Sequence, residues 1–86
     1  MGGDTFSDTG QRLREAIVGQ IPDAQVEVEV GSPGHFSLRV VSRVFTVKSP
    51  VQQQQAVYAA IAPLMRGNDA PVHAIDRLRT MVPPGA

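Results

Sequence analysis

The chain has 86 residues, of which 42% are hydrophobic and 19% charged, so it is long enough for one small globular domain but not for two. Eight Lys and Arg balance eight Asp and Glu, and the resulting net charge of zero argues against strong sequence-independent binding of nucleic acid. Without cysteine the chain is neither a disulfide scaffold nor a thiolate metal site by itself, and no apolar run is long enough for a membrane span.

The N-terminal segment predicts a flexible lead followed by an amphipathic helix. We assign the lead to residues 1–6 and a single domain to residues 7–84. Ser7 or Asp8 is the expected N-cap, because a short polar side chain can accept hydrogen bonds from the free amides of the first turn. The helix is predicted over Thr9–Gln20. Its apolar stripe has helical spacing and consists of Leu13, Ala16, Ile17 and Ile21.

Two strands joined by a turn are predicted next. Residues 25–30 alternate strictly between valine and Gln or Glu, which is the pattern of a half-buried strand. Gly31-Ser32-Pro33-Gly34 is a turn by composition. His35–Val47 is predicted as the second strand, and the shift of its apolar parity near Val40-Val41 indicates a bulge or a twist. Together the two strands form an antiparallel hairpin.

Ser49-Pro50 marks the start of a second helix, because serine caps a helix and proline suits its first position. Pro63 lies inside the helical pattern and is expected to kink or divide the helix, and Gly67-Asn68-Asp69 ends it. The last segment, Val72–Val82, is ambiguous. The spacing of its apolar residues favours a helix, but its length does not exclude a strand.

Six short motifs follow one another through the second half of the chain. They are His35-Phe36, Val40-Val41-Ser42 with Phe45, Ser49 with Val51, Val57-Tyr58, Val72-His73-Ala74-Ile75 and Val82-Pro83. In this order and spacing they resemble the BolA-like family. Gln54-Gln55 before Ala56-Val57-Tyr58 is most similar to the acid-stress branch of that family, the IbaG/YrbA-like proteins.

The resemblance implies an α+β fold of the order α-β-β-α-α-β, similar to a type II KH domain, with a three-stranded mixed sheet and its helices on one face. It therefore assigns Val72–Val82 to a third strand beside the hairpin. This strand has one residue too many at Asp76-Arg77, which a β-bulge would absorb. This extra residue is one departure from the family pattern, and two more are visible. Phe45-Thr46-Val47 replaces a Phe-x-Gly turn, and the glutamines 52–55 replace a basic pair.

His73 is the main candidate metal ligand. An imidazole nitrogen can bind the iron of a [2Fe–2S] cluster, but such a cluster needs four ligands. The resemblance implies that a monothiol glutaredoxin and glutathione supply the others, so that the chain is a monomer alone and a heterodimer with this partner. His35 is the second, weaker candidate. Family members often have a Cys or His in the turn before it; this turn contains neither, and His35 is the nearest nitrogen, although the match is imperfect. For both histidines the alternative is a structural role in capping or packing.

The first functional hypothesis is a non-enzymatic adaptor in iron–sulfur trafficking or iron and stress sensing, since no nucleophile lies in a catalytic motif. The second is a KH-like DNA-binding stress-response regulator, although the Gly-x-x-Gly loop is absent. A structural interaction module is the third. Four polar residues are weaker candidates for a partner or nucleic-acid surface: Ser49, Gln52, Gln53 and Arg77. We expect a cytoplasmic, bacterial protein without membrane association.

Overall fold

The computed structural model describes residues 5–85 and the side chains from residue 8 onward. The elements in chain order are α1 (Thr5–Gln20), β1 (Gln25–Val30), β2 (His35–Val41), the 3₁₀ helix η1 (Arg43–Val47), α2 (Pro50–Met65) and β3 (Ala74–Met81). The expected α+β fold with a three-stranded mixed sheet is confirmed. The short helix η1 takes the place of the first of the two helices expected between the second and third strands.

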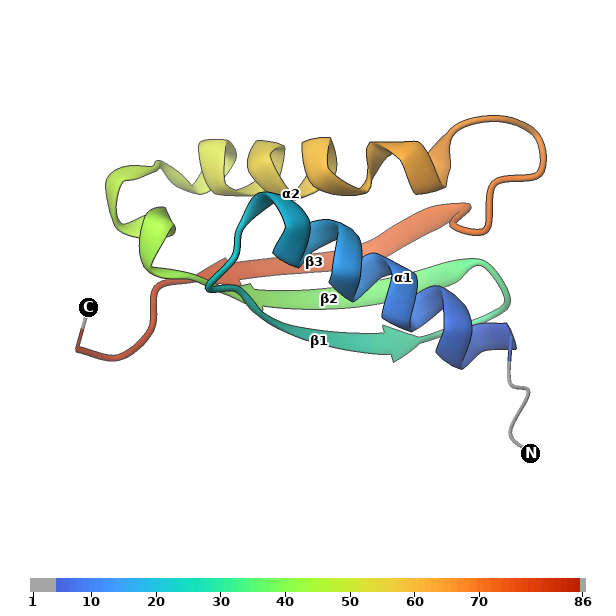
Figure 1. Cartoon of the computed structure of the whole chain (residues 1–86), viewed down its shortest axis with the longest axis horizontal. Coiled ribbons are helices and arrows are strands. Elements are labelled where there is room, and N and C mark those ends of the chain that lie inside the picture. Colours follow the sequence, from blue (N-terminus) through green and yellow to red (C-terminus); the bar gives the residue numbers. More distant parts are fainter. Residues whose placement is uncertain (1–4, 86) are drawn as a thin grey trace.

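The sheet has the strand order β1-β2-β3, with β1 and β2 antiparallel and β2 and β3 parallel (Figure 1). The ambiguous last segment is therefore a strand, as the family resemblance implied, and the helix favoured by its local pattern is wrong. Phe36 pairs with Ile75 whereas Ser37 pairs with Arg77, so Asp76 is the additional residue. The predicted β-bulge is confirmed, and it displaces the Asp76 position from the regular ladder.

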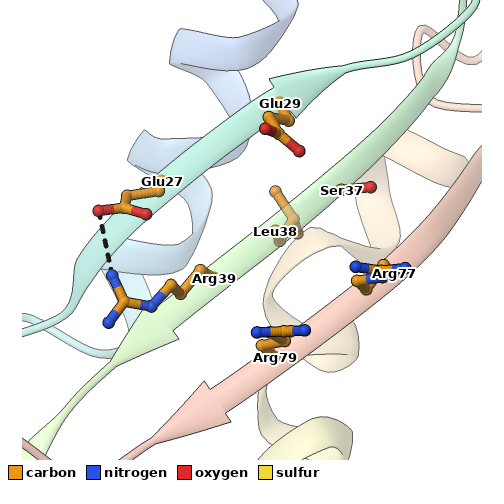
Figure 2. A pocket seen from close by; sticks show the side chains of 7 residues that line it. All are labelled: Glu27, Glu29, Ser37, Leu38, Arg39, Arg77 and Arg79. Atoms are coloured by element: carbon orange, nitrogen blue, oxygen red, sulfur yellow. Dashed lines mark hydrogen bonds and ion pairs between the residues drawn. The ribbon is translucent and has the colours of Figure 1, made fainter.

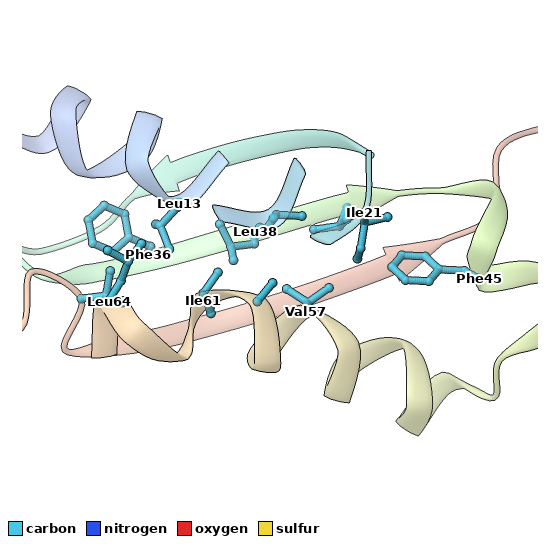
Figure 3. Close-up of a cluster of buried hydrophobic side chains, with 12 residues drawn as sticks. Leu13, Ile21, Phe36, Leu38, Phe45, Val57, Ile61 and Leu64 are labelled. Atoms are coloured by element: carbon cyan, nitrogen blue, oxygen red, sulfur yellow. The ribbon is translucent and has the colours of Figure 1, made fainter. Parts of the chain in front are cut away.

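The hydrophobic core lies between the sheet and the two α-helices. Side chains from α1, β2 and α2 meet there in one cluster (Figure 3). Its fully buried members are Leu13, Ile17, Phe36, Val40, Phe45, Val57, Ile61 and Val72. Burial of a side chain of this size contributes roughly 1.5–3 kcal/mol, so this cluster is the main source of stability. Helices α1 and α2 lie on the same face of the sheet (Figure 1), and no helix among residues 5–85 covers the opposite face, which we call the open face.

The helix boundaries confirm one predicted cap and correct the other. Helix α1 begins at Thr5, so the predicted cap at Ser7 or Asp8 is wrong; Asp8 lies in the first turn, where a carboxylate is favourable next to the helix dipole. The part of the predicted lead at residues 1–4 lies outside the described residues. Helix α2 begins after Ser49 as predicted, and it continues through Pro63 without division. In the described part of the chain, neither helix is long and apolar enough to cross a membrane.

The second strand ends at Val41, six residues earlier than predicted, because hydrogen bonds turn the backbone at Ser42. The Ser42 hydroxyl accepts from the Val44 amide at 3.1 Å and donates to Asp23 Oδ1 at 2.6 Å. The Arg43 amide donates to Asp23 Oδ2 at 2.9 Å. The Ser42 hydroxyl first, and then the Arg43 amide, lower the pKa of the Asp23 carboxyl by stabilising its charged form. Asp23 thus ties the turn between α1 and β1 to the start of η1.

The turn after Phe45 forms without the glycine that many family members have there. Phe45 is fully buried, and its carbonyl accepts from the Lys48 amide at 3.1 Å. Val47, which stands where the family has glycine, is 86% exposed. No non-glycine residue in the range 5–85 has a positive φ, so this turn uses backbone angles that are open to any L-residue.

Candidate functional site

His73 lies at the hairpin end of the sheet, immediately before β3. Its backbone amide donates to the Gly34 carbonyl at 2.8 Å, and the Ala74 amide donates to the same oxygen at 3.1 Å. Gly34 is the last residue of the turn between β1 and β2. The two hydrogen bonds therefore fix the start of β3 against this turn, while His73 itself remains exposed to solvent.

The imidazole of His73 lies directly against Gly34. A Cβ atom added at Gly34 would be 2.1 Å from His73 Cδ2 and 2.9 Å from its Cγ. Gly34 also has a φ of 80°, a left-handed conformation that L side chains rarely adopt. Glycine at position 34 thus meets two requirements, a turn with positive φ and space for the ring.

His35 and Asp76 form a second polar pair at the same end of the sheet. His35 Nδ1 lies 3.0 Å from Asp76 Oδ1, and the two side chains are 40% and 51% exposed. Asp76 is the bulge residue of β3, and one of its oxygens would lie 3.5 Å from a Cβ at Gly31. Since Nδ1 faces the carboxylate, Nε2 is the nitrogen of His35 that remains for a ligand bond.

Asp76 and Arg77 follow His73 closely in the sequence, so they could be exposed strand charges or groups that orient its ring. In the structure Asp76 pairs with His35 instead, and Arg77 forms no side-chain hydrogen bond or ion pair with the described residues. Sequence reasoning missed the pairing of His35 with Asp76. The predicted bulge was the signal that could have found it, because the parallel register of β2 and β3 brings the two residues to the same end of the sheet.

The site offers imidazole nitrogen as its characteristic ligand type. In residues 5–85 no group of three or more His, Cys, Asp and Glu side chains is close enough to hold a metal ion. The whole sequence contains no cysteine. These residues therefore fit a role in which the chain adds one or two nitrogen ligands to a metal group whose other ligands come from elsewhere.

Three of the four weaker candidates have structural contacts at the start of α2. Ser49 and Gln52 form a capping box, in which the Gln52 amide donates to Ser49 Oγ at 3.2 Å and the Ser49 amide donates to Gln52 Oε1 at 2.9 Å. Gln53 Nε2 donates to the carbonyls of Phe45 and Lys48. Arg77, the fourth candidate, is not part of this cap; it belongs to β3 and lies on the open face of the sheet.

The sequence profile that describes BolA-like proteins matches residues 20–83, which include all three strands, α2 and both histidines. The chain belongs to the BolA-like family. An uncharacterised Acinetobacter guillouiae protein from the rpoN–murA intergenic region is 40% identical to it over 65 residues, which are 76% of this chain and 75% of that protein.

Solved structures of BolA-like proteins share this fold. BolA1 from Arabidopsis thaliana superposes with a TM-score of 0.71 at 19% identity, covering 90% of this chain and 94% of that one. The BolA domain of SufE1 from the same plant gives a TM-score of 0.70 at 24% identity, covering 100% and 99%. A BolA homologue from Coxiella burnetii gives 0.69 at 23%, covering 85% and 88%. At these identities the likeness establishes the BolA-like fold.

Proposed function

We propose that this BolA-like chain is a non-enzymatic adaptor that binds a monothiol glutaredoxin and shares a [2Fe–2S] cluster with it through His73. The observation that carries the proposal is the exposed His73 imidazole, which lies against Gly34 and follows a backbone anchored on the same residue. A ligand that completes a shared cluster has to be accessible to a partner and held in place before the partner binds. His73 satisfies both requirements.

The composition of the chain supports a shared cluster rather than a resident one. Four ligands are needed, whereas the described residues offer no group of three metal-binding side chains and the sequence has no cysteine. In the proposal the thiolates come from the cysteine of the glutaredoxin and from glutathione. A cluster with imidazole in place of thiolate differs in charge and in reduction potential, which suits relay or sensing.

His35 is proposed as the second ligand, through Nε2. The contact of Nδ1 with Asp76 resembles the carboxylate–histidine pairs that orient metal-bound imidazoles in other proteins. This contact selects one nitrogen and limits rotation of the ring. We give His35 the weaker assignment because it is partly covered and engaged with a carboxylate, whereas the His73 side chain makes no polar contact with the described residues.

The finer placement within the family is part of the same proposal. Gln54-Gln55 before Ala56-Val57-Tyr58 supports the acid-stress, IbaG/YrbA-like branch. The Acinetobacter relative supports a bacterial protein, for which we propose a cytoplasmic location. The adaptor would be a heterodimer when it is loaded with its partner.

Anaerobic reconstitution of the chain with a monothiol glutaredoxin, iron, sulfide and glutathione tests the proposal. Wild type should co-purify with the glutaredoxin and give a visible spectrum that differs from that of the glutaredoxin alone. His73→Ala should lose this difference, and His35→Ala should change it less. Gln54→Ala, an exposed substitution on α2, is the matched control and should leave it unchanged. A spectrum unaffected by His73→Ala would exclude His73 as a ligand.

The regulator hypothesis has less support in the geometry. Ser49, Gln52 and Gln53 already use their side chains in hydrogen bonds that hold the start of α2. A salt titration of DNA binding separates the two functions, since a regulator that contacts phosphates must bind more weakly as salt rises. Binding of this kind, together with an unchanged cluster spectrum in His73→Ala, would favour the regulator over the adaptor.

A further inference from the structure

The open face of the sheet carries charges that are sorted by strand. Glu27 and Glu29 project from β1, Arg39 from β2, and Arg77 and Arg79 from β3 (Figure 2). All five are exposed, and with Ser37 they line a shallow hollow on this face. One edge of the face is therefore acidic and the opposite edge basic, although the chain as a whole is neutral.

The strand register arranges these residues in two rows across the sheet. Glu27 pairs with Arg39, which pairs with Arg79, and Glu29 pairs with Ser37, which pairs with Arg77. Arg39 Nη1 forms an ion pair with Glu27 Oε2 at 3.2 Å. Within residues 5–85 no ion pair involves Glu29, Arg77 or Arg79. Arg79 lies directly opposite another arginine, an unfavourable neighbour.

We propose that this open face associates with the same face of a second copy of the chain. A two-fold axis that runs parallel to the strands and over β2 would place β1 of each copy above β3 of the other. The rows remain in register under this rotation. Glu27 then faces Arg79 of the second copy and Glu29 faces Arg77, and symmetry repeats both contacts. The unpaired charges of one copy are thus matched by those of the other, whereas Arg39, which is already paired with Glu27, faces Arg39 of the second copy on the axis.

The charge pattern disfavours the other arrangements. A two-fold axis perpendicular to the strands would place β1 above β1, with the carboxylates facing one another. Antiparallel pairing of two free β1 edges would bring Glu27 and Glu29 beside the same residues of the second copy, which is repulsive. A nucleic acid would meet two carboxylates on this face, and none of the residues that line the hollow offers an aromatic ring for base stacking.

The proposed dimer is expected to be weak and reversible. Strands of this length span roughly 20 Å and three strands roughly 14 Å, so the face is smaller than the roughly 800 Å² that each partner contributes to a standard interface. Its contacts are exposed ion pairs, which salt screens. In the lower half of the range measured for such pairs, four of them correspond to about a tenfold change in the dissociation constant.

Sedimentation equilibrium of the full chain at high protein concentration, in low and high salt, tests the proposal. Wild type should self-associate at low salt, with a dissociation constant that rises about tenfold when the charges are screened. The reversals Glu27→Arg with Glu29→Arg, and Arg77→Glu with Arg79→Glu, should each give a monomer. An equimolar mixture of the two variants should form a heterodimer, because their faces are oppositely charged.

A control variant changes net charge by the same amount and sign as the reversal of Glu27 and Glu29, but away from this face, through Glu15→Arg with Asp69→Arg, both exposed. It should associate like wild type, and circular dichroism should show that every variant is folded. A wild type that stays monomeric at low salt would overturn the proposal. Self-association that survives either reversal, or a mixture of the two variants that stays monomeric, would also overturn it.

Discussion

Gly34→Ala tests how the turn positions His73. Gly34 has a φ of 80°, and an L-residue in the left-handed region costs about 1–2 kcal/mol. The new Cβ would also lie 2.1 Å from His73 Cδ2, so the ring would have to move. Overpacking by an added methyl group costs about 1–3 kcal/mol in the free energy of unfolding. Because the His73 ring is exposed and can move, we expect a cost at the lower end of this range. We expect a total loss of about 2–3 kcal/mol in the free energy of unfolding, or about 10–20 °C in Tm.

The matched control is Gly67→Ala, since Gly67 has a similar φ of 86° and no atom within 4 Å of a built Cβ. It should lose only the backbone contribution, about 1–2 kcal/mol. Urea unfolding followed by circular dichroism measures both variants, alone and combined with His73→Ala. Removing the ring should reduce the cost of Gly34→Ala by about 1 kcal/mol and leave that of Gly67→Ala unchanged. Equal costs for Gly34→Ala with and without His73 would refute the packing of the ring against this turn.

Three further substitutions test the contacts that hold the elements around the site. Ser49→Ala removes the side-chain cap of α2 and should lower the free energy of unfolding by about 1 kcal/mol in urea titrations, whereas exposed Gln55→Ala should leave it within about 0.5 kcal/mol. Gln53→Ala removes two donated hydrogen bonds and one accepted one, and should cost about 1–3 kcal/mol by the same measurement. Asp23→Asn should flatten the acid dependence of stability measured by urea unfolding at several pH values. The folded pKa of Asp23 is lowered mainly by the Ser42 hydroxyl, so its stabilisation is complete above the ordinary aspartate pKa of about 3.9 and is lost as pH falls through the folded pKa. An acid dependence in Asp23→Asn equal to that of wild type would contradict this assignment.

The parts of the fold that have a clear period or a strong turn signal could be predicted from the sequence. The alternation in residues 25–30 predicted β1, and Ser49-Pro50 predicted the start of α2. The end of β2 could not be predicted in this way. It depends on Ser42 donating to Asp23, a residue 19 positions earlier, and a local pattern does not contain this contact. The start of α1 was misplaced because Ser7 and Asp8 suit a first helical turn as well as a cap.

The last strand shows the limit of periodicity more clearly. The apolar spacing around Ile75 and Leu78 has the helical appearance partly because the bulge residue Asp76 interrupts the alternation. Pairing with β2 outweighs the local preference, and only the resemblance to a family indicated this. For the candidate site, both histidines could be proposed from the sequence. Their surroundings could not be predicted in this way. The packing of His73 against Gly34 and the contact of His35 with Asp76 each join two segments that are about 40 residues apart in the chain.

The central claim is that His73 supplies a nitrogen ligand to the shared cluster. Its most direct test is pulsed electron paramagnetic resonance of the reduced complex, reconstituted from ¹⁵N-histidine-labelled chain and unlabelled glutaredoxin. Because the label is confined to this chain, a ¹⁵N hyperfine coupling can come only from His73 or His35. We predict that the coupling is present in wild type, is retained in His35→Ala and disappears or falls sharply in His73→Ala. A wild-type complex that carries a cluster but shows no ¹⁵N coupling, or a coupling unchanged in His73→Ala, would contradict the account.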